Sequence, residues 1–235
     1  RNDEPSPTRS AVLVRRSNGH IRIGTFQRLA YLNEQDNLEK LLDYLRDNYF
    51  THINENSNRV IFIETIFLEC VKKIATSMGK IIISGFVHGV LNTDNFNVTG
   101  EVFDFGPWRF IQYANQNFTA AYFDYNGRYS FGKQPEAALW ALTQLGKSLN
   151  KFISEKRIVE ILNEFSTNFH LSLKNHFCWR IGIQDIDTKS HSEIMNILFN
   201  ESEKYEIEYA SFFNDWQFFR ISAVFENPST LYFFP

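Results

Sequence analysis

The chain has 235 residues, of which 43% are hydrophobic and 16% aromatic, and its formal net charge is −3 at pH 7. This composition can fill a substantial core and excludes a disordered protein, while the charge argues against a groove for nucleic acid. Since no run of about 18 apolar residues occurs, we also expect no membrane partner.

Residues 1–10 are polar and contain two prolines, which indicates a linker, and we expect residues 11–235 to form one domain. The domain opens with Ala11–Arg15, an apolar run that is typical of a strand and ends in charge. A turn follows, and Arg15 and Arg22 flank it. Arginines at a turn can clamp phosphate oxygens through paired hydrogen bonds, but spacing alone favours two solvated surface arginines.

Two helical patterns come next. From Phe26 to Tyr49, leucines repeat at helical spacing along one face. After a polar loop, the longest expected helix has apolar residues every three or four positions from Ile63 to Met78. It delivers the chain through Gly79 to a loop at His88.

The segment from His88 to Pro107 carries the candidate chemistry. It holds the pair Asp94 and Asn95, and then Asp104, which opens an Asp-Phe-Gly sequence. Short alternating segments around Thr99-Gly100 predict a tight hairpin, which would bring Asn95 and Asp104 to the same end of two paired strands. An amide oxygen and a carboxylate that converge there form a site that Mg²⁺ accepts when substrate phosphates supply the other ligands. The alternative is a polar hairpin with a chance Asp-Phe-Gly.

Kinase-like enzymes build a metal site from an Asn on the catalytic loop and the Asp of Asp-Phe-Gly. In a protein kinase, the catalytic base would fall at Val90, five residues before Asn95. The only acid nearby is Asp94. The sequence therefore indicates either an inactive kinase or different chemistry with the acid in a shifted place.

The remainder of the chain is predicted to be mainly helical. Pro135 closes a loop at the start of a helix over Glu136–Leu149. A further helix is expected over residues 156–177. Another begins at a capping box, Ser190–Glu193, and a last one runs from Tyr209 to Arg220. The helix over Glu136–Leu149 is expected to bury Leu139, Trp140, Leu142 and Leu145.

The two cysteines, Cys70 and Cys178, are far apart and lack the spacing of metal ligands. Buried free thiols in a reducing compartment are the default for such a pair. No signal peptide opens the chain. We therefore expect a cytoplasmic protein of bacterial type, or a mitochondrial one if the source is eukaryotic.

The predicted fold class is α+β and mostly helical, with one small catalytic β-hairpin. This description matches the C-terminal lobe of a protein-kinase-like fold. The N-terminal lobe is expected to be largely missing, because the sequence contains neither a glycine-rich phosphate loop nor a strand with a Val-Ala-Ile-Lys-type lysine.

Several segments, in order, also carry a likeness to a known family. The string His-Gly-x-x-Asn-Thr-Asp-Asn, which ends at Asn95, is highly specific. The matching segments are Ala11–Arg15, His20–Phe26, Gly85–Asn95, Asp104–Pro107 and Gly127–Pro135. Through them the chain resembles the selenoprotein O (SelO/YdiU) family of kinase-like protein adenylyltransferases over nearly its whole length.

The resemblance implies that AMP, rather than phosphate, is transferred from ATP to Ser, Thr or Tyr hydroxyls of proteins. It implies that Asp94 is the catalytic acid and that Asn95 and Asp104 bind Mg²⁺, or Mn²⁺ in its place. It further implies that Arg15, Arg22 and Asp104 bind ATP. The family thus favours a phosphate role for the two arginines, which their spacing does not.

A family member would carry the glycine-rich loop and lysine upstream of Arg1, and a redox-active cysteine or selenocysteine beyond Pro235. We therefore expect this chain to be the catalytic-lobe portion of a longer protein. Two alternatives stay open. One is a phosphotransferase that acts on a small molecule or a protein, since such kinases also use a His-Gly loop and a following acid. The other is an inactive fragment or pseudoenzyme.

Overall fold

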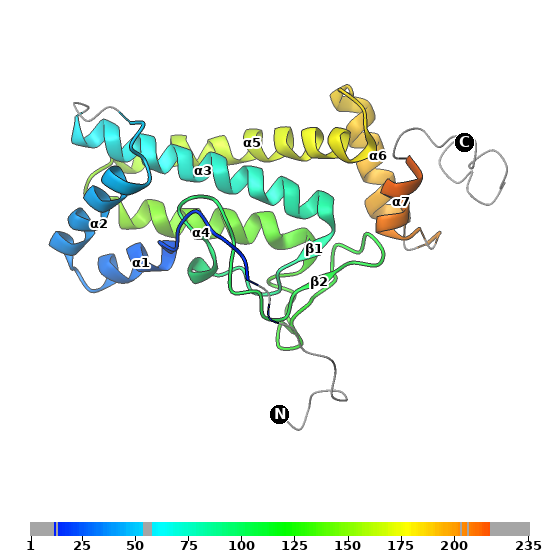
Figure 1. Ribbon diagram of the computed structural model, residues 1–235, viewed down its shortest axis with the longest axis horizontal. Coiled ribbons are helices and arrows are strands. Elements are labelled where there is room, and N and C mark those ends of the chain that lie inside the picture. The colour runs from blue at the N-terminus through cyan, green and yellow to red at the C-terminus, as the bar shows by residue number, and fades with distance from the viewer. Residues whose placement is uncertain (1–11, 13, 54–57, 203, 206, 217–235) are drawn as a thin grey trace.

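The computed structural model is mostly helical, with one two-stranded antiparallel sheet (Figure 1). This agrees with the predicted α+β, mainly helical class. The linker predicted over residues 1–10 lies outside the described part of the chain. The structure describes residues 12, 14–53, 58–202, 204–205 and 207–216.

Three helices form the centre of the molecule. The helices α3 (Arg59–Ser84) and α5 (Glu155–Ile181) lie side by side, and α4 (Gln134–Ser148) packs against both of them (Figure 1). Asn58 caps the start of α3 by accepting a hydrogen bond from the Val60 N–H. With its apolar face buried from Phe62 to Ile83, α3 forms the axis around which the other elements pack.

The prediction for α3 was too short. The helix continues through Gly79 to Ser84, and Gly79 packs directly against α5. A Cβ atom on Gly79 would lie 2.5 Å from Ser172 Oγ and 2.8 Å from the Leu173 backbone nitrogen. With 27 residues against 26, α5 is also longer than the helix expected to be the longest.

The helical pattern from Phe26 to Tyr49 is two helices, α1 (Ile23–Tyr31) and α2 (Gln35–Asn48). Between them Asn33 takes a φ of 56°, the left-handed conformation that asparagine tolerates best after glycine. The helical spacing is correct on either side of the break. The predicted apolar face of α2 is confirmed where it is buried, at Leu38, Leu42 and Leu45.

Two predictions in the C-terminal half were wrong. In α4, Leu142 and Leu145 are buried as expected, but Leu139 and Trp140 are 36% and 41% exposed. The N-cap of α6 (Thr188–Glu201) is Asp187, whose side chain accepts a hydrogen bond from the Ser190 N–H, so Ser190 does not cap the helix.

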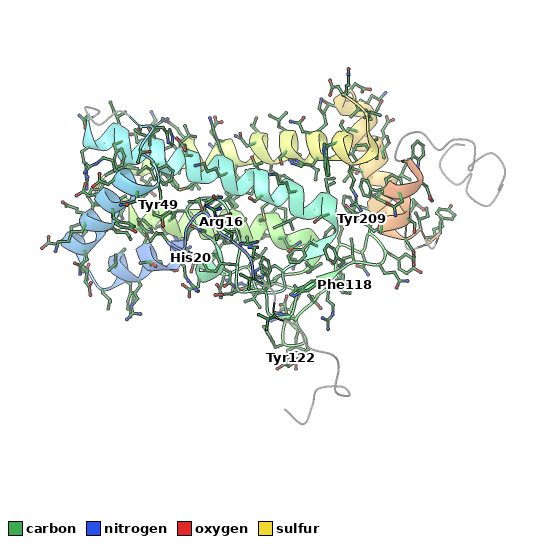
Figure 2. The ribbon with its side chains drawn as sticks, viewed as in Figure 1. Arg16, His20, Tyr49, Phe118, Tyr122 and Tyr209 are labelled. Atoms are coloured by element: carbon green, nitrogen blue, oxygen red, sulfur yellow. The ribbon has the colours of Figure 1, made fainter. Side chains whose placement is uncertain are left out.

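A second apolar cluster joins the C-terminal ends of α3 and α5 to α6 and α7 (Tyr209–Trp216). Figure 2 shows Tyr209 at this junction, where its buried hydroxyl donates a 2.7 Å hydrogen bond to the Ile82 carbonyl. Burial raises the pKa of Tyr209. The helix predicted from Tyr209 to Arg220 is confirmed as far as Trp216, and its last four residues lie outside the described part.

The loops gather below the C-terminal end of α3 in Figure 1. There β1 (Phe86–Val87) pairs with β2 (Arg109–Phe110), a sheet that the sequence did not predict. Of the predicted strand at Ala11–Arg15, Ala11 and Leu13 are outside the described residues and the others are not in a strand. No helix in the described part of the chain is long and apolar enough to cross a membrane.

Candidate active site

Asp94 and Asn95 lie on one short turn. They belong to the 3-10 helix η1 (Thr93–Asn95), which Asn92 caps by accepting a 2.9 Å hydrogen bond from the Asp94 N–H. The turn points the two side chains to different environments, because Asp94 is exposed whereas Asn95 is 6% exposed. The Asn95 amide nitrogen donates to the Val90 carbonyl, which fixes the orientation of the amide group.

The predicted hairpin follows this turn, although it is limited to isolated bridges. Phe96 pairs with Val102, and the Asn97 N–H donates a 2.9 Å hydrogen bond to the Glu101 carbonyl. At the open end, the Phe103 N–H donates a 3.2 Å hydrogen bond to the Asn95 carbonyl. The chain is thereby folded so that Asn95 lies across from the residue that precedes Asp104.

Arg22 connects the two ends of the site. Its Nη1 atom lies 2.8 Å from Asp104 Oδ2 and donates a 3.2 Å hydrogen bond to the Asp94 carbonyl. Its guanidinium lies 4.6 Å from the centre of the Phe103 ring. Because both partners of the ion pair are about half exposed, the pair adds little to stability, but it brings a cation, Asp94 and Asp104 together.

Asp104 has an unusual backbone conformation, with a φ of 61°. Left-handed geometry is uncommon for residues other than glycine, and aspartate is one of the few that adopt it. Arg15 lies beside the same segment, where it donates a hydrogen bond to the Val102 carbonyl and stacks 4.8 Å from the centre of the Phe105 ring. The two arginines named in the sequence therefore both contact the segment from Val102 to Phe105, which contains Asp104.

His88 ties the loop to the hairpin from inside. Its ring is fully buried, its Nε2 donates a 2.8 Å hydrogen bond to the Phe103 carbonyl, and its Nδ1 accepts one from the Val90 N–H. That pattern requires the neutral imidazole. Burial lowers the pKa of His88 below its ordinary value, in agreement with the hydrogen bonds.

Sequence reasoning gave no role to Gly24 or Gln27, which position Asp94 from α1. A Cβ atom on Gly24 would lie 2.9 Å from Asp94 Cγ and closer still to Asp94 Oδ1. Gln27 accepts a 2.9 Å hydrogen bond from the Thr93 hydroxyl. The carboxylate of Asp94 therefore lies against the first turn of α1, where the helix dipole favours negative charge. The signal in the sequence that could have indicated this contact was a glycine, Gly24, near the start of a helix.

The Asn95 and Asp104 side chains carry the amide and carboxylate oxygens that hard divalent cations bind. Since the Asn95 nitrogen is engaged by Val90, its Oδ1 is the atom left to coordinate, and Asp104 keeps one carboxylate oxygen that Arg22 does not contact. No group of three or more His, Cys, Asp or Glu residues gathers as a metal site among the described residues. Such a pair of oxygens suits Mg²⁺ when phosphates complete the shell.

Comparisons with known proteins give a consistent family. The family described as "Protein adenylyltransferase SelO" matches residues 1–231. The chain is 37% identical over 213 residues to "Protein nucleotidyltransferase YdiU" of Trichormus variabilis. This match covers 91% of the chain and 43% of that relative. Relatives with the same name match from Synechocystis sp., at 42% identity over 70% of the chain and 35% of the relative, and from Bacillus cereus, at 31% over 93% and 46%. The chain thus spans less than half the length of these relatives.

Proposed function

The chain belongs to the SelO family, and we propose that it carries the catalytic turn of a protein adenylyltransferase, which transfers AMP from ATP to Ser, Thr or Tyr hydroxyls of proteins. The observation that carries the proposal is the link made by Arg22 between the Asp94 backbone and the Asp104 carboxylate. This link joins the loop that carries Asp94 and Asn95 to the Asp104 carboxylate, which supports a shared site for metal-assisted nucleotidyl transfer. The relatives bear the name protein nucleotidyltransferase, which supports the proposal.

Asp94 is the group that would act on the acceptor. Its carboxylate is exposed and lies against the first turn of α1, so that an incoming hydroxyl can reach it. From there it orients the hydroxyl or takes its proton as the oxygen attacks the α-phosphorus. Val90, at the position of a protein-kinase base, has only an apolar side chain, which leaves Asp94 as the acid of this loop.

Asn95 and Asp104 would hold the divalent cation, Mg²⁺ or Mn²⁺. When bound, that ion neutralises charge on the polyphosphate of ATP. Arg22 uses only Nη1 within the described residues, so its other N–H groups are available to phosphate oxygens. Arg15 lies over the ring of Phe105, which is the residue next to Asp104. Together the arginines would hold the pyrophosphate as it leaves.

We assign the helical body to the C-terminal lobe of a kinase-like fold. The support is local: a buried histidine on the loop, His88, is hydrogen-bonded to the residue before Asp104, which opens Asp-Phe-Gly. This hydrogen bond connects the loop at His88 directly to the start of the Asp-Phe-Gly segment. We also place the protein in the cytoplasm of a bacterial cell, on the strength of its bacterial relatives.

The test determines which phosphate of ATP is transferred to the acceptor protein. Acceptor protein is incubated with the chain and Mg²⁺, with ATP labelled at the α-phosphate in one series and at the γ-phosphate in the other. The proposal predicts that only the α-label reaches the acceptor and that Asp94→Asn abolishes the signal. Transfer of the γ-label would instead identify a phosphotransferase.

A non-enzymatic remnant is tested separately by calorimetric titration with ATP and Mg²⁺. The proposal predicts binding that is lost on substitution of Asp104. A folded sample that releases no heat would favour the remnant.

A further inference from the structure

A pocket of about 390 Å³ lies beside the catalytic loop. Its floor includes Leu91, three residues before Asp94, and its walls come from the loop ahead of α4 and the first turns of that helix. Three residues span at most about 11 Å. The Leu91 side of the pocket therefore lies within about 11 Å of Asp94, measured between Cα atoms, a distance that three extended residues can span. Charged and aromatic side chains also line the pocket: Arg128, Tyr129, Lys133, Glu136 and Trp140.

The pocket presents two cations. Arg128 lies over the Trp140 ring, 5.2 Å from its centre, and also 5.6 Å from the centre of the Tyr129 ring. Neither Arg128 nor Lys133 forms an ion pair with any carboxylate in the part of the chain that the structure describes. Both rings lie within cation–π distance of the Arg128 guanidinium, and a guanidinium group can bind a carboxylate with two hydrogen bonds.

The loop that carries Arg128 is held by its own backbone contacts. The two oxygens of Asp124 accept hydrogen bonds of 2.8 and 2.7 Å from the N–H groups of Arg128 and Tyr129. Gly132 donates a 2.8 Å hydrogen bond to the Gln116 carbonyl on the other side. A site that is already ordered loses less conformational entropy when a ligand binds.

Trp140, like Leu139, was assigned to the core by helix periodicity, and the structure leaves it 41% exposed. An indole on a helix next to a stacked arginine is poorly explained by packing, and such local departures from pattern concentrate at functional sites. Tryptophan and arginine are also the residues that dominate binding energy in protein interfaces. The exposed indole supplies an apolar wall for the aliphatic part of a ligand.

We propose that this pocket receives an acidic side chain of the acceptor protein, an Asp or Glu within about three residues of the hydroxyl that is presented to Asp94. The inference rests on the proposed function, because it concerns the acceptor of that same site. Arg128 and Lys133 together outweigh the single negative charge of Glu136 in the pocket. The carboxylate pairs with Arg128, and its methylene groups pack on Trp140.

The test measures binding directly, without ATP. Fluorescein-labelled peptides with one central Tyr, flanked by Glu, Gln or Lys, are titrated with the chain and followed by fluorescence anisotropy. The Glu peptide should bind about two- to fivefold more tightly than the Gln peptide, the range expected for one exposed ion pair, and the Lys peptide should bind least tightly. Arg128→Gln should remove the difference between Glu and Gln peptides.

Two further variants separate a charge effect from misfolding. Glu136→Gln removes the opposing charge and should tighten binding of the Glu peptide, which a damaged fold would not do. Lys156→Gln, on α5 and outside the pocket, should change nothing. Equal binding of the three peptides, or unchanged binding in Arg128→Gln, would overturn the inference.

The outcome is independent of catalysis. Acid-dependent binding without transfer of the α-label would contradict the proposed function alone. Transfer of the α-label with no preference for acidic peptides would contradict only this inference.

Discussion

At the scale of single residues, the position of Asp94 depends on a glycine in the first turn of α1. Gly24 leaves room for the Asp94 carboxylate against α1. In Gly24→Ala, the new methyl group would displace the carboxylate, and small misplacements of a reacting group lower rates by up to about a hundredfold. We expect AMP transfer to fall by about ten- to a hundredfold. The free energy of unfolding should change by less than about 1 kcal/mol, because an exposed carboxylate can rotate away.

The measurements are the transfer rate and a urea unfolding curve. Thr25→Ala is the control, since Thr25 is exposed in the same turn. Transfer at the wild-type rate in Gly24→Ala would show that the position of Asp94 is not critical.

The sequence named Asp94, Asn95, Asp104, Arg15 and Arg22, but it could not supply the contacts that arrange them. Hairpin spacing correctly predicted that Asn95 and Asp104 lie at one end of a paired segment. Nothing in the spacing indicated that Arg22 would contact both Asp94 and Asp104, because residues 22 and 104 meet only through tertiary packing. Arg22 is partly exposed and pairs with Asp104, a contact that the alternative of a solvated surface arginine did not include.

At the scale of elements, the close contact between α3 and α5 passes through Gly79. Alanine favours a helix interior over glycine by about 1 kcal/mol, but here its Cβ would overlap Ser172 and the Leu173 backbone, and overpacking costs about 1–3 kcal/mol. We therefore predict that Gly79→Ala lowers the free energy of unfolding. Lys80→Ala, exposed on the next position of α3, should be close to neutral.

Chemical denaturation of the two variants checks this prediction. A Gly79→Ala protein that is more stable than the wild type would mean that the helices can separate at this point at no cost.

Element prediction succeeded where one period extended over many residues and failed at ends and contacts. The periodic apolar positions of α3 were correct, whereas Gly79 did not mark the helix end and Ser190 did not cap α6. Glycine in a sequence does not distinguish a break from a close approach. The strands β1 and β2, of two residues each, carry too little pattern to detect.

At the scale of the whole molecule, two buried histidines couple stability to pH. Burial lowers the pKa of both His88 and His191, against ordinary values near 6.5. Asp104 opposes the shift at His88 and Arg15 reinforces it, while Lys174 and His170 reinforce the shift at His191. Below pH 6.5 the unfolded chain binds protons that the folded chain does not, so stability falls as the solution is acidified.

We predict a free energy of unfolding that decreases from pH 7.5 to pH 5.5, by at most about 1.4 kcal/mol per pH unit for each histidine. Urea unfolding at several pH values measures it. The double variant His88→Gln/His191→Gln should flatten the curve over this window. An unchanged slope in the double variant would assign the effect to other groups.

The central claim for the whole protein is that Asn95, Asp104 and Arg22 form one site for a divalent cation and ATP. The most direct test is a calorimetric titration of the protein with ATP in the presence of Mg²⁺. It compares the variant Asp104→Ala with the control variant Asp185→Ala. Asp185 is also an exposed aspartate paired with a cation, at 2.7 Å from Lys174, but it lies between α5 and α6. We predict that Asp104→Ala abolishes the binding heat and that Asp185→Ala retains it. Equal binding by the two variants would contradict the account.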